Sequence, residues 1–164
     1  MSAQPLILDH DKWRKGAGGA RADLSGESDG SAYAGLDLNL ITFASSSFSG
    51  SSFTATTFRD ANWSGCHFSG CSFSGCELQG IKITGCTFSH CTFAQSKFKA
   101  SSFRACRFTQ CSWVGLNFDA SQWSQVSLLD CRGSQIIAID LQGEKVDFTG
   151  SEFKDIQLTN ARLY

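Results

Sequence analysis

The segment SGCHFSGCSFSGCELQGIKITGCTFSHCTFAQSKF, residues 64–98, decides the fold, because one five-residue pattern runs through it unbroken. Large apolar residues stand at every fifth position, from Phe68 and Phe73 onward to Phe98. A small or apolar residue precedes each of them by two positions, as Cys66 precedes Phe68. A period of five fits neither the 3.6-residue turn of an α-helix nor the two-residue repeat of a flat strand. It indicates a coil in which each unit forms one side and turns a corner, with two side chains inward and three outward.

The pattern extends in one phase from Leu38 to Leu163. The central position of each unit is apolar at almost every step, and the position two residues earlier is small or apolar throughout. All eight cysteines of the chain fall in this second column. An internal repeat of this kind is typical of a solenoid.

Units such as Ala61-Asn62-Trp63-Ser64-Gly65 and Cys71-Ser72-Phe73-Ser74-Gly75 resemble the pentapeptide-repeat family, whose consensus unit is Ala-(Asp/Asn)-Leu-x-x. The resemblance covers residues 36–164. It implies an all-β fold, a right-handed quadrilateral parallel β-helix in which four units make one square coil and about six to seven coils stack. Stacking then places aromatic residues of successive coils in two ladders that form the structural core: Phe48, Phe68, Phe88 and Phe108, and Phe53, Phe73, Phe93 and Trp113.

The two ends of the repeat differ. Residues 1–35 are expected to be an N-terminal extension and capping segment, and residues 36–164 the β-helix. Within the extension, residues 22–26 match the consensus one residue out of phase, which predicts a capping coil followed by a short insertion. Residues 5–8 and Trp13 are expected to fold over the first coil, because a bare solenoid end exposes its core and unpaired backbone groups. No helical segment follows the last repeat, which favours an end-to-end homodimer or docking on a partner.

One stretch departs from the pattern, because Gly133, Ala138 and Gly143 occupy central positions. Large residues in the neighbouring column, such as Ile136 and Leu141, would compensate for the lost volume. A bulge or loop between two regular stacks is the alternative.

The cysteines are expected to form parallel ladders inside the coil. Stacked Cβ atoms would lie about 4.8 Å apart, farther than the ~3.8 Å that a disulfide prefers. Parallel ladders also do not converge tetrahedrally on zinc. We therefore expect reduced, inert thiols, no metal site, and a cytoplasmic location, with export by a signal-peptide-independent system as a variant of that expectation.

The charges exclude some classes of partner. The formal net charge is −1, which implies no global attraction to nucleic acid or to a membrane. No apolar run approaches the ~20 residues of a membrane span, and the first residues do not resemble a cleaved signal peptide. Between Leu78 and Phe118 the charged residues are all basic, and we expect them to form a belt around the rod that binds an anionic partner surface: Lys82, Lys97, Lys99, Arg104 and Arg107. A merely solvated surface is the alternative.

The sequence offers few candidates for catalysis. His67 and His90 fall in outward columns, with no carboxylate placed to orient either ring, and His10 lies outside the repeat. A serine nucleophile would need a positioned base, and no phosphate-binding loop appears. We therefore expect no cofactor and no enzymatic activity.

Three functions remain to be weighed. A rigid rod with polar faces suits a protein-interaction module, and the family resemblance suggests an accessory or effector protein of a bacterial secretion system. The alternative is a DNA-mimicking modulator of DNA gyrase or topoisomerase, as in quinolone-resistance members of the family. Those members have an acidic rod and a C-terminal helix, whereas this chain is basic in its middle. A glycan-binding role is disfavoured, because Trp63, Trp113 and Trp123 all occupy the inward column.

Overall fold

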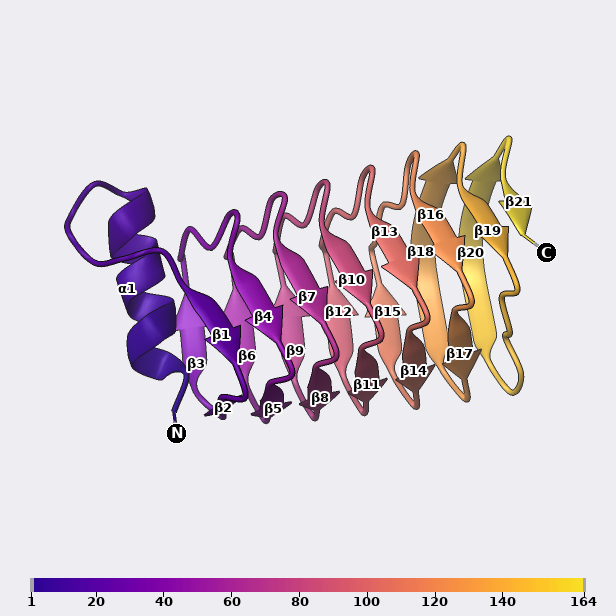
Figure 1. Cartoon of the computed structure of the whole chain (residues 1–164). Helices are drawn as coiled ribbons and strands as arrows, with labels where there is room; N and C mark the ends of the chain where they lie inside the picture. The colour runs from indigo at the N-terminus through magenta and orange to yellow at the C-terminus, as the bar shows by residue number, and fades with distance from the viewer. Residues whose placement is uncertain (1, 164) are drawn as a thin grey trace.

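The computed structural model describes residues 2–163 and shows a rod of stacked parallel coils with a helix across one end (Figure 1). About seven coils follow one another, and the last strand lies at the end of the rod opposite the helix. Three sides of the coil are parallel sheets of eight, six and seven strands. The fourth side is joined by isolated bridges such as Thr57 to Glu77 and Glu77 to Lys97. The expected all-β quadrilateral parallel solenoid is confirmed.

We number the four sides in the order in which the chain meets them. Face 1 is the eight-stranded sheet of β1 (Asp23–Ser25), β4 (Thr42–Ala44), β7 (Asn62–Ser64), β10 (Lys82–Thr84), β13 (Ser102–Arg104), β16 (Gln122–Ser124), β19 (Gln142–Glu144) and β21 (Arg162–Leu163). Face 2 is the six-stranded sheet of β2 (Ser28–Asp29), β5 (Ser47–Ser49), β8 (His67–Ser69), β11 (Thr87–Ser89), β14 (Arg107–Thr109) and β17 (Ser127–Leu129). Face 3 is the seven-stranded sheet of β3 (Ala32–Ala34), β6 (Ser52–Thr54), β9 (Ser72–Ser74), β12 (Thr92–Ala94), β15 (Ser112–Val114), β18 (Arg132–Ile139) and β20 (Glu152–Thr159). Face 4 is the bridged side, completed in the last two coils by the second halves of β18 and β20.

The corners explain why the period is five. Every fifth residue from Gly35 to Asn160 has a positive φ, for example 60° at Gly65 and 54° at Ala105. This left-handed conformation turns the chain after each short strand. Glycine adopts it freely, whereas an L-residue with a side chain pays about 1–2 kcal/mol there. The corner column is therefore rich in glycine and other small residues.

The core consists of the predicted aromatic ladders. The rings of Phe68 and Phe88 stack with centroids 4.7 Å apart and planes 5° from parallel, and those of Phe88 and Phe108 are 4.6 Å apart at 5°. The second ladder stacks in the same way as far as Phe93. Trp113 departs from it, because its ring meets Phe93 edge-on at 83°. Both ladders are buried, which confirms the inward assignment of the central column.

The first coil lies inside the segment expected to be an extension. Its strands β1 and β2 pair 19 residues ahead, as Leu24 does with Phe43, whereas β3 pairs 20 ahead, as Tyr33 does with Phe53. The expected insertion is therefore wrong: the corner at Gly30 is one residue shorter than the others. A Cβ atom there would lie 2.9 Å from the carbonyl oxygen of Ser49, so this tight corner needs glycine. The β-helix thus begins at β1, ahead of the boundary expected at residue 36.

Helix α1 (Gln4–Arg14) covers the first coil, as expected for the segment around Pro5 and Trp13. Pro5 lies in its first turn, where a missing N–H costs nothing. Ile7 and His10 are its buried residues, while Trp13 remains 37% exposed. The sequence predicted that this segment folds over the coil but not that it is helical. Among residues 2–163, no helix has the length and apolar character of a membrane span.

At the central positions occupied by glycine, other side chains fill the core volume, and the chain forms no bulge or loop there. Gly133 has no side chain, and the space beside it is filled by the ring of Phe153 and the Cδ1 methyl group of Ile136. At Gly143 a Cβ atom would lie 2.7 Å from Leu163 Cδ2 and 3.0 Å from Val146 Cγ2. The register also continues, with Gly133 between Trp113 and Phe153. Ile136 and Val146 supply part of the missing volume from the second column, as predicted, but the nearest atoms belong to Phe153 and Leu163 in the central column of the next coil.

Candidate interaction surface

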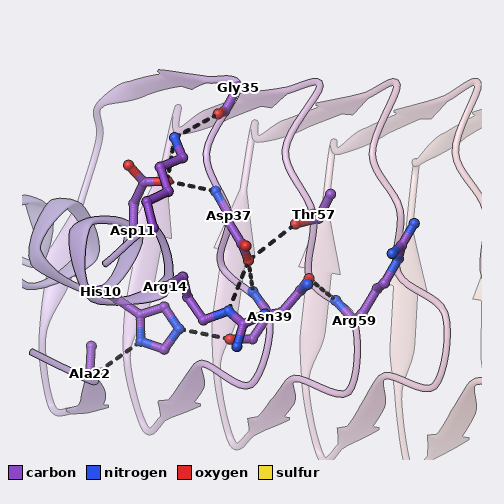
Figure 2. Close-up of polar contacts among 10 residues, drawn as sticks. His10, Asp11, Arg14, Ala22, Gly35, Asp37, Asn39, Thr57 and Arg59 are labelled. Carbon is purple, nitrogen blue, oxygen red and sulfur yellow. Dashed lines mark hydrogen bonds and ion pairs between the residues drawn. The ribbon is translucent and has the colours of Figure 1, made fainter. Parts of the chain in front are cut away.

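The N-terminal cap is fixed by a buried histidine (Figure 2). His10 is fully buried, and its Nδ1 accepts a hydrogen bond of 2.9 Å from the backbone N–H of Ala22. Its Nε2 therefore carries the proton and donates to the carbonyl oxygen of Asn39 at 2.8 Å. Burial lowers the pKa of His10, with the cations Arg14 and Arg21 acting in the same direction. The neutral ring is thus the form that ties the helix to the first coil.

Charged contacts surround this histidine (Figure 2). Asp11 Oδ1 accepts a 2.7 Å hydrogen bond from the backbone N–H of Asp37. The Arg14 guanidinium forms an ion pair with the Asp37 carboxylate at 3.2 Å. Lys15 pairs with Asp11 at 2.8 Å. These charged contacts join helix α1 to the first coil.

The structure distributes the predicted basic belt over three sides. Lys82 begins β10 and Arg104 ends β13 on face 1, while Arg107 begins β14 on face 2. Lys97 and Lys99 lie on face 4. All five are exposed. Their placement on neighbouring sides agrees with the sequence interpretation, but their electrostatic surroundings differ.

On face 4 the cations have acidic neighbours. Lys97 is bridged to Glu77 of the preceding coil and to Asn117 of the next. Lys99 is followed by Asp119, whose carbonyl accepts the N–H of the corner residue Ala100. Arg59, on the same side, forms an ion pair with Glu77. Lys97 and Lys99 therefore belong to a ladder of mixed charge, and the belt does not continue as a positive surface across face 4.

On faces 1 and 2 the three remaining cations have uncharged neighbours. Lys82 lies in register with Asn62 and Ser102. The neighbours of Arg104 are Thr84 and Ser124, and those of Arg107 are Thr87 and Ser127. The ion pairs formed within residues 2–163 involve other side chains. We call Lys82, Arg104 and Arg107 the cationic triad.

A shallow open groove adjoins the triad on face 1. It crosses β13, β16 and β19 and has a volume of about 530 Å³. Its floor is the backbone at Phe103 and Trp123, and its walls are two rows of outward side chains that include Arg104 and Gln122. Glu144 closes the far end, two strands from Arg104. The groove is lined by hydrogen-bonding groups and suits an extended polar ligand better than an apolar one.

The thiols lie inside the coil. All eight cysteines are buried and free. Each points into the coil, as Cys106 shows by donating weakly to the carbonyl oxygens of Ile83 and Arg104 at 3.2 and 3.4 Å. Burial raises the pKa of Cys76 and Cys106 to about 11, so both remain protonated at neutral pH. Such thiols behave as small apolar residues.

The histidines of the repeat are exposed on the surface. His90 occupies a corner, where its Nδ1 lies 3.1 Å from Ser89 Oγ. Within residues 2–163, no carboxylate forms a hydrogen bond with His67 or His90, and no cluster of metal-ligating side chains is found. This arrangement lacks the oriented base that a serine nucleophile requires.

Sequence reasoning missed the acidic residues that lie beside Lys97 and Lys99 on face 4. Glu77 and Asp119 lie just outside the interval from Leu78 to Phe118 that made the belt look purely basic. The signal was present, because residues 20 positions apart are lateral neighbours in this fold. The buried role of His10 had no such signal, since it depends on a helix outside the repeat.

The family models agree with this geometry. A model described as "pentapeptide repeat region" matches residues 81–163, about half of the chain, and "pentapeptide repeats (8 copies)" matches residues 51–89. The chain belongs to the pentapeptide-repeat family. Among curated proteins, none matches significantly by sequence.

Several solved structures are similar to this chain at low identity and with TM-scores below 0.5. A trypsin-treated form of QnrB1, a plasmid-mediated fluoroquinolone resistance protein, is 17% identical, covers 88% of this chain and 91% of its own, and gives a TM-score of 0.45. HetL, involved in heterocyst differentiation regulation in Nostoc sp. strain PCC 7120, is 17% identical over 94% of both chains, with a TM-score of 0.33. The catalytic unit of an α-1,3-glucanase from Streptomyces thermodiastaticus is 7% identical over 84% of this chain and 44% of its own, with a TM-score of 0.29. These likenesses describe the fold alone.

Proposed function

We propose that this protein is a non-enzymatic interaction module that binds an acidic partner protein through the middle of faces 1 and 2. The observation that carries the proposal is the cationic triad, whose exposed side chains have uncharged neighbours in register. A charge that is not already neutralised within its own chain is free to steer and hold a partner of opposite charge.

The surface around the cationic triad allows a partner protein to approach the three cations closely. Lys82 and Arg104 extend from adjacent strands of one regular sheet, and the residues beside them are small and polar, such as Ser102 and Thr84. The rigid backbone of the rod needs no ordering on binding, so the ordering cost is limited to the side chains of the cations. An acidic strand or loop would meet Arg104 and the polar side chains of Gln122 and Ser124 at the near end of the groove, and would stop short of the Glu144 carboxylate at its far end.

Affinity capture tests the proposal with a matched pair of variants. The triad variant K82Q/R104Q/R107Q removes three unneutralised cations, and the control K97Q/K99Q removes two cations that have acidic neighbours. After nuclease treatment, a protein enriched by the wild type and by K97Q/K99Q but lost with the triad variant is expected, and added salt should weaken its capture. Equal capture by all three forms would refute the proposal.

The DNA-mimicking alternative would need a long surface of negative charge. Acidic residues do gather in the last coils, but basic ones alternate with them: Arg132 lies in register with Glu152, and Lys145 follows Glu144. The middle of the rod carries the cationic triad. These observations favour an acidic partner over a mimic of DNA, and a supercoiling assay with purified gyrase is expected to show no effect at micromolar protein.

The expectation that the protein serves a bacterial secretion system, from the cytoplasm or after export, is a narrower proposal that rests on the family resemblance. Cell fractionation and analysis of the culture medium would test it. A captured partner outside any secretion apparatus would leave the binding proposal intact and remove the narrower one.

A further inference from the structure

Seven of the inward cysteines form two ladders along the rod. Members of a ladder are 20 residues apart in sequence, and all of them are buried. Backbone hydrogen bonds join their coils directly, since the N–H of Thr92 donates to the carbonyl oxygen of Cys71 at 2.9 Å. The two sets are the four-thiol ladder, Cys71, Cys91, Cys111 and Cys131, and the three-thiol ladder, Cys66, Cys86 and Cys106.

The eighth cysteine stacks on hydroxyl side chains instead. Cys76 lies between Thr56 and Ser96, and its N–H donates to Ser96 Oγ at 3.2 Å. Its Sγ is 3.3 Å from the carbonyl oxygen of Phe53. Cys76 is therefore as buried as the ladder thiols but has no thiol one coil away, which makes it an internal control.

Successive sulfur atoms of a ladder occupy equivalent positions. Cys91 Sγ is 3.3 Å from the carbonyl oxygen of Phe68, and Cys111 Sγ is 3.3 Å from that of Phe88, one coil further. The same contact recurs at the other two members of the four-thiol ladder. Equivalent atoms of neighbouring parallel strands repeat at about 4.8 Å. Successive sulfurs are therefore about 4.8 Å apart, far beyond the ~2.05 Å of an S–S bond.

This spacing matches a metal ion held in line between two thiolates. Metal–thiolate bonds are about 2.3 Å long, so a linear S–metal–S unit spans about 4.6 Å. A tetrahedral zinc site does not fit, because a row of sulfurs offers only two ligands to a point between them. Adjacent coils are in direct register, so the line between two successive sulfurs crosses no other strand.

The charge of the ion decides which soft metal fits the core. Thiolates prefer soft metal ions, and Hg(II) binds two of them in line. Two S–H bonds break, two S–Hg bonds form and two protons pass to solvent, so the unit carries no net charge. Cu(I) or Ag(I) would leave one negative charge in the core, where an unpaired charge is costly.

We propose that stacked thiols of the two ladders bind Hg(II) as linear S–Hg–S units, each formed by two cysteines one coil apart. Each thiolate serves one ion, so the four-thiol ladder holds two ions and the three-thiol ladder holds one. The hydrogen bonds that are lost are weak, because a thiol is a weak donor. The carbonyl oxygen of Ser89 also keeps the N–H of Gly70 at 2.9 Å. The inference is independent of the proposed binding of an acidic partner, because it uses the interior of the rod.

Native mass spectrometry counts the ions. Mercuric chloride is added to the reduced protein, both after folding and before refolding from denaturant, and three ions per wild-type chain are expected. C86S should hold two ions, because it leaves the other members of its ladder two coils apart. C106S should still hold three, because the Cys66–Cys86 pair remains, and C76S should also hold three. Equal counts for C86S and C106S, or a wild type that binds no ion by either route, would overturn the proposal.

A second ladder and a structural readout make the test independent of one variant. C91S should also lose one ion, because only the Cys111–Cys131 pair remains in its ladder. Serine is accommodated at these positions, since Ser96, Ser101 and Ser121 are buried in the same column. X-ray absorption at the mercury edge should show two sulfur neighbours at about 2.3 Å, and circular dichroism should show an unchanged fold. Three or more sulfur neighbours, or unfolding on loading, would contradict a linear site inside the rod.

Discussion

Replacing His10 with leucine should detach the N-terminal cap while leaving the rod folded. In the wild type, the ring accepts from the N–H of Ala22 and donates to the carbonyl of Asn39. Leucine fills part of the volume but satisfies neither group. Each buried polar group left without a partner costs about 1–3 kcal/mol. Because water can partly solvate these two backbone groups, we expect the free energy of opening the cap to fall by about 2–4 kcal/mol.

Hydrogen exchange and limited proteolysis measure this opening. The N–H of Ile7, which donates to Ala3 at 3.0 Å, should lose protection in H10L. The linker containing Gly18 should be cleaved faster. Amides of the central coils, such as that of Phe88, should not change. H67L, at an exposed position of β8, is the matched control and should behave as the wild type. Unchanged protection of Ile7 in H10L would refute the role given to His10.

The wild-type cap should also open in acid. Burial lowers the pKa of His10 in the folded cap, so the open form binds a proton first as the pH falls. Cap stability is therefore complete above the unperturbed pKa of about 6.5 and declines below it toward the folded pKa. Asp37 opposes this shift, while Arg14 and Arg21 reinforce it. H10L should lose this part of the pH dependence.

Three further predictions concern the repeat itself. F88A should lower the free energy of unfolding by about 3–5 kcal/mol, because Phe88 is fully buried and stacks on both neighbouring coils; in denaturant titrations the control S69A, at an exposed position of β8, should lose less than about 0.5 kcal/mol. A105G should raise the free energy of unfolding by about 1 kcal/mol, since Ala105 has a φ of 54°, and a thermal melt with no gain would contradict that reasoning. Cys106 should resist alkylation at pH 8 in the folded protein and react after denaturation, because burial raises its pKa to about 11; rapid labelling of the native protein would show that the thiol is accessible.

Much of the fold could be predicted from the sequence, because the five-residue period determines the register of the strands, the residues that face the core and the positions of the corners. Phe68, Phe88 and Phe108 could be placed as stacked neighbours before any coordinates, since an unbroken phase leaves no freedom in the register. The same regularity explained why Gly133 could be tolerated beside Ile136. The shortened corner at Gly30 was not foreseen, because a corner that lacks one residue and an insertion of four residues leave a five-residue pattern in the same phase.

The surface was harder to predict than the core. The sequence placed Lys97 and Lys99 in an outward column, but their electrostatic role depends on Glu77 and Asp119 one coil away. The helical form of α1 was also missed, because its periodicity is weak and its buried contacts are with another part of the chain.

The central claim is that the cationic triad binds an acidic partner, and an affinity measurement tests it most directly. The dissociation constant of the captured partner should be measured for the wild type, for K82Q/R104Q/R107Q and for K97Q/K99Q at two salt concentrations. Loss of three exposed ionic contacts should weaken binding by about thirtyfold at low salt. The control should stay within about threefold of the wild type. Equal affinities for the wild type and the triad variant would contradict the account.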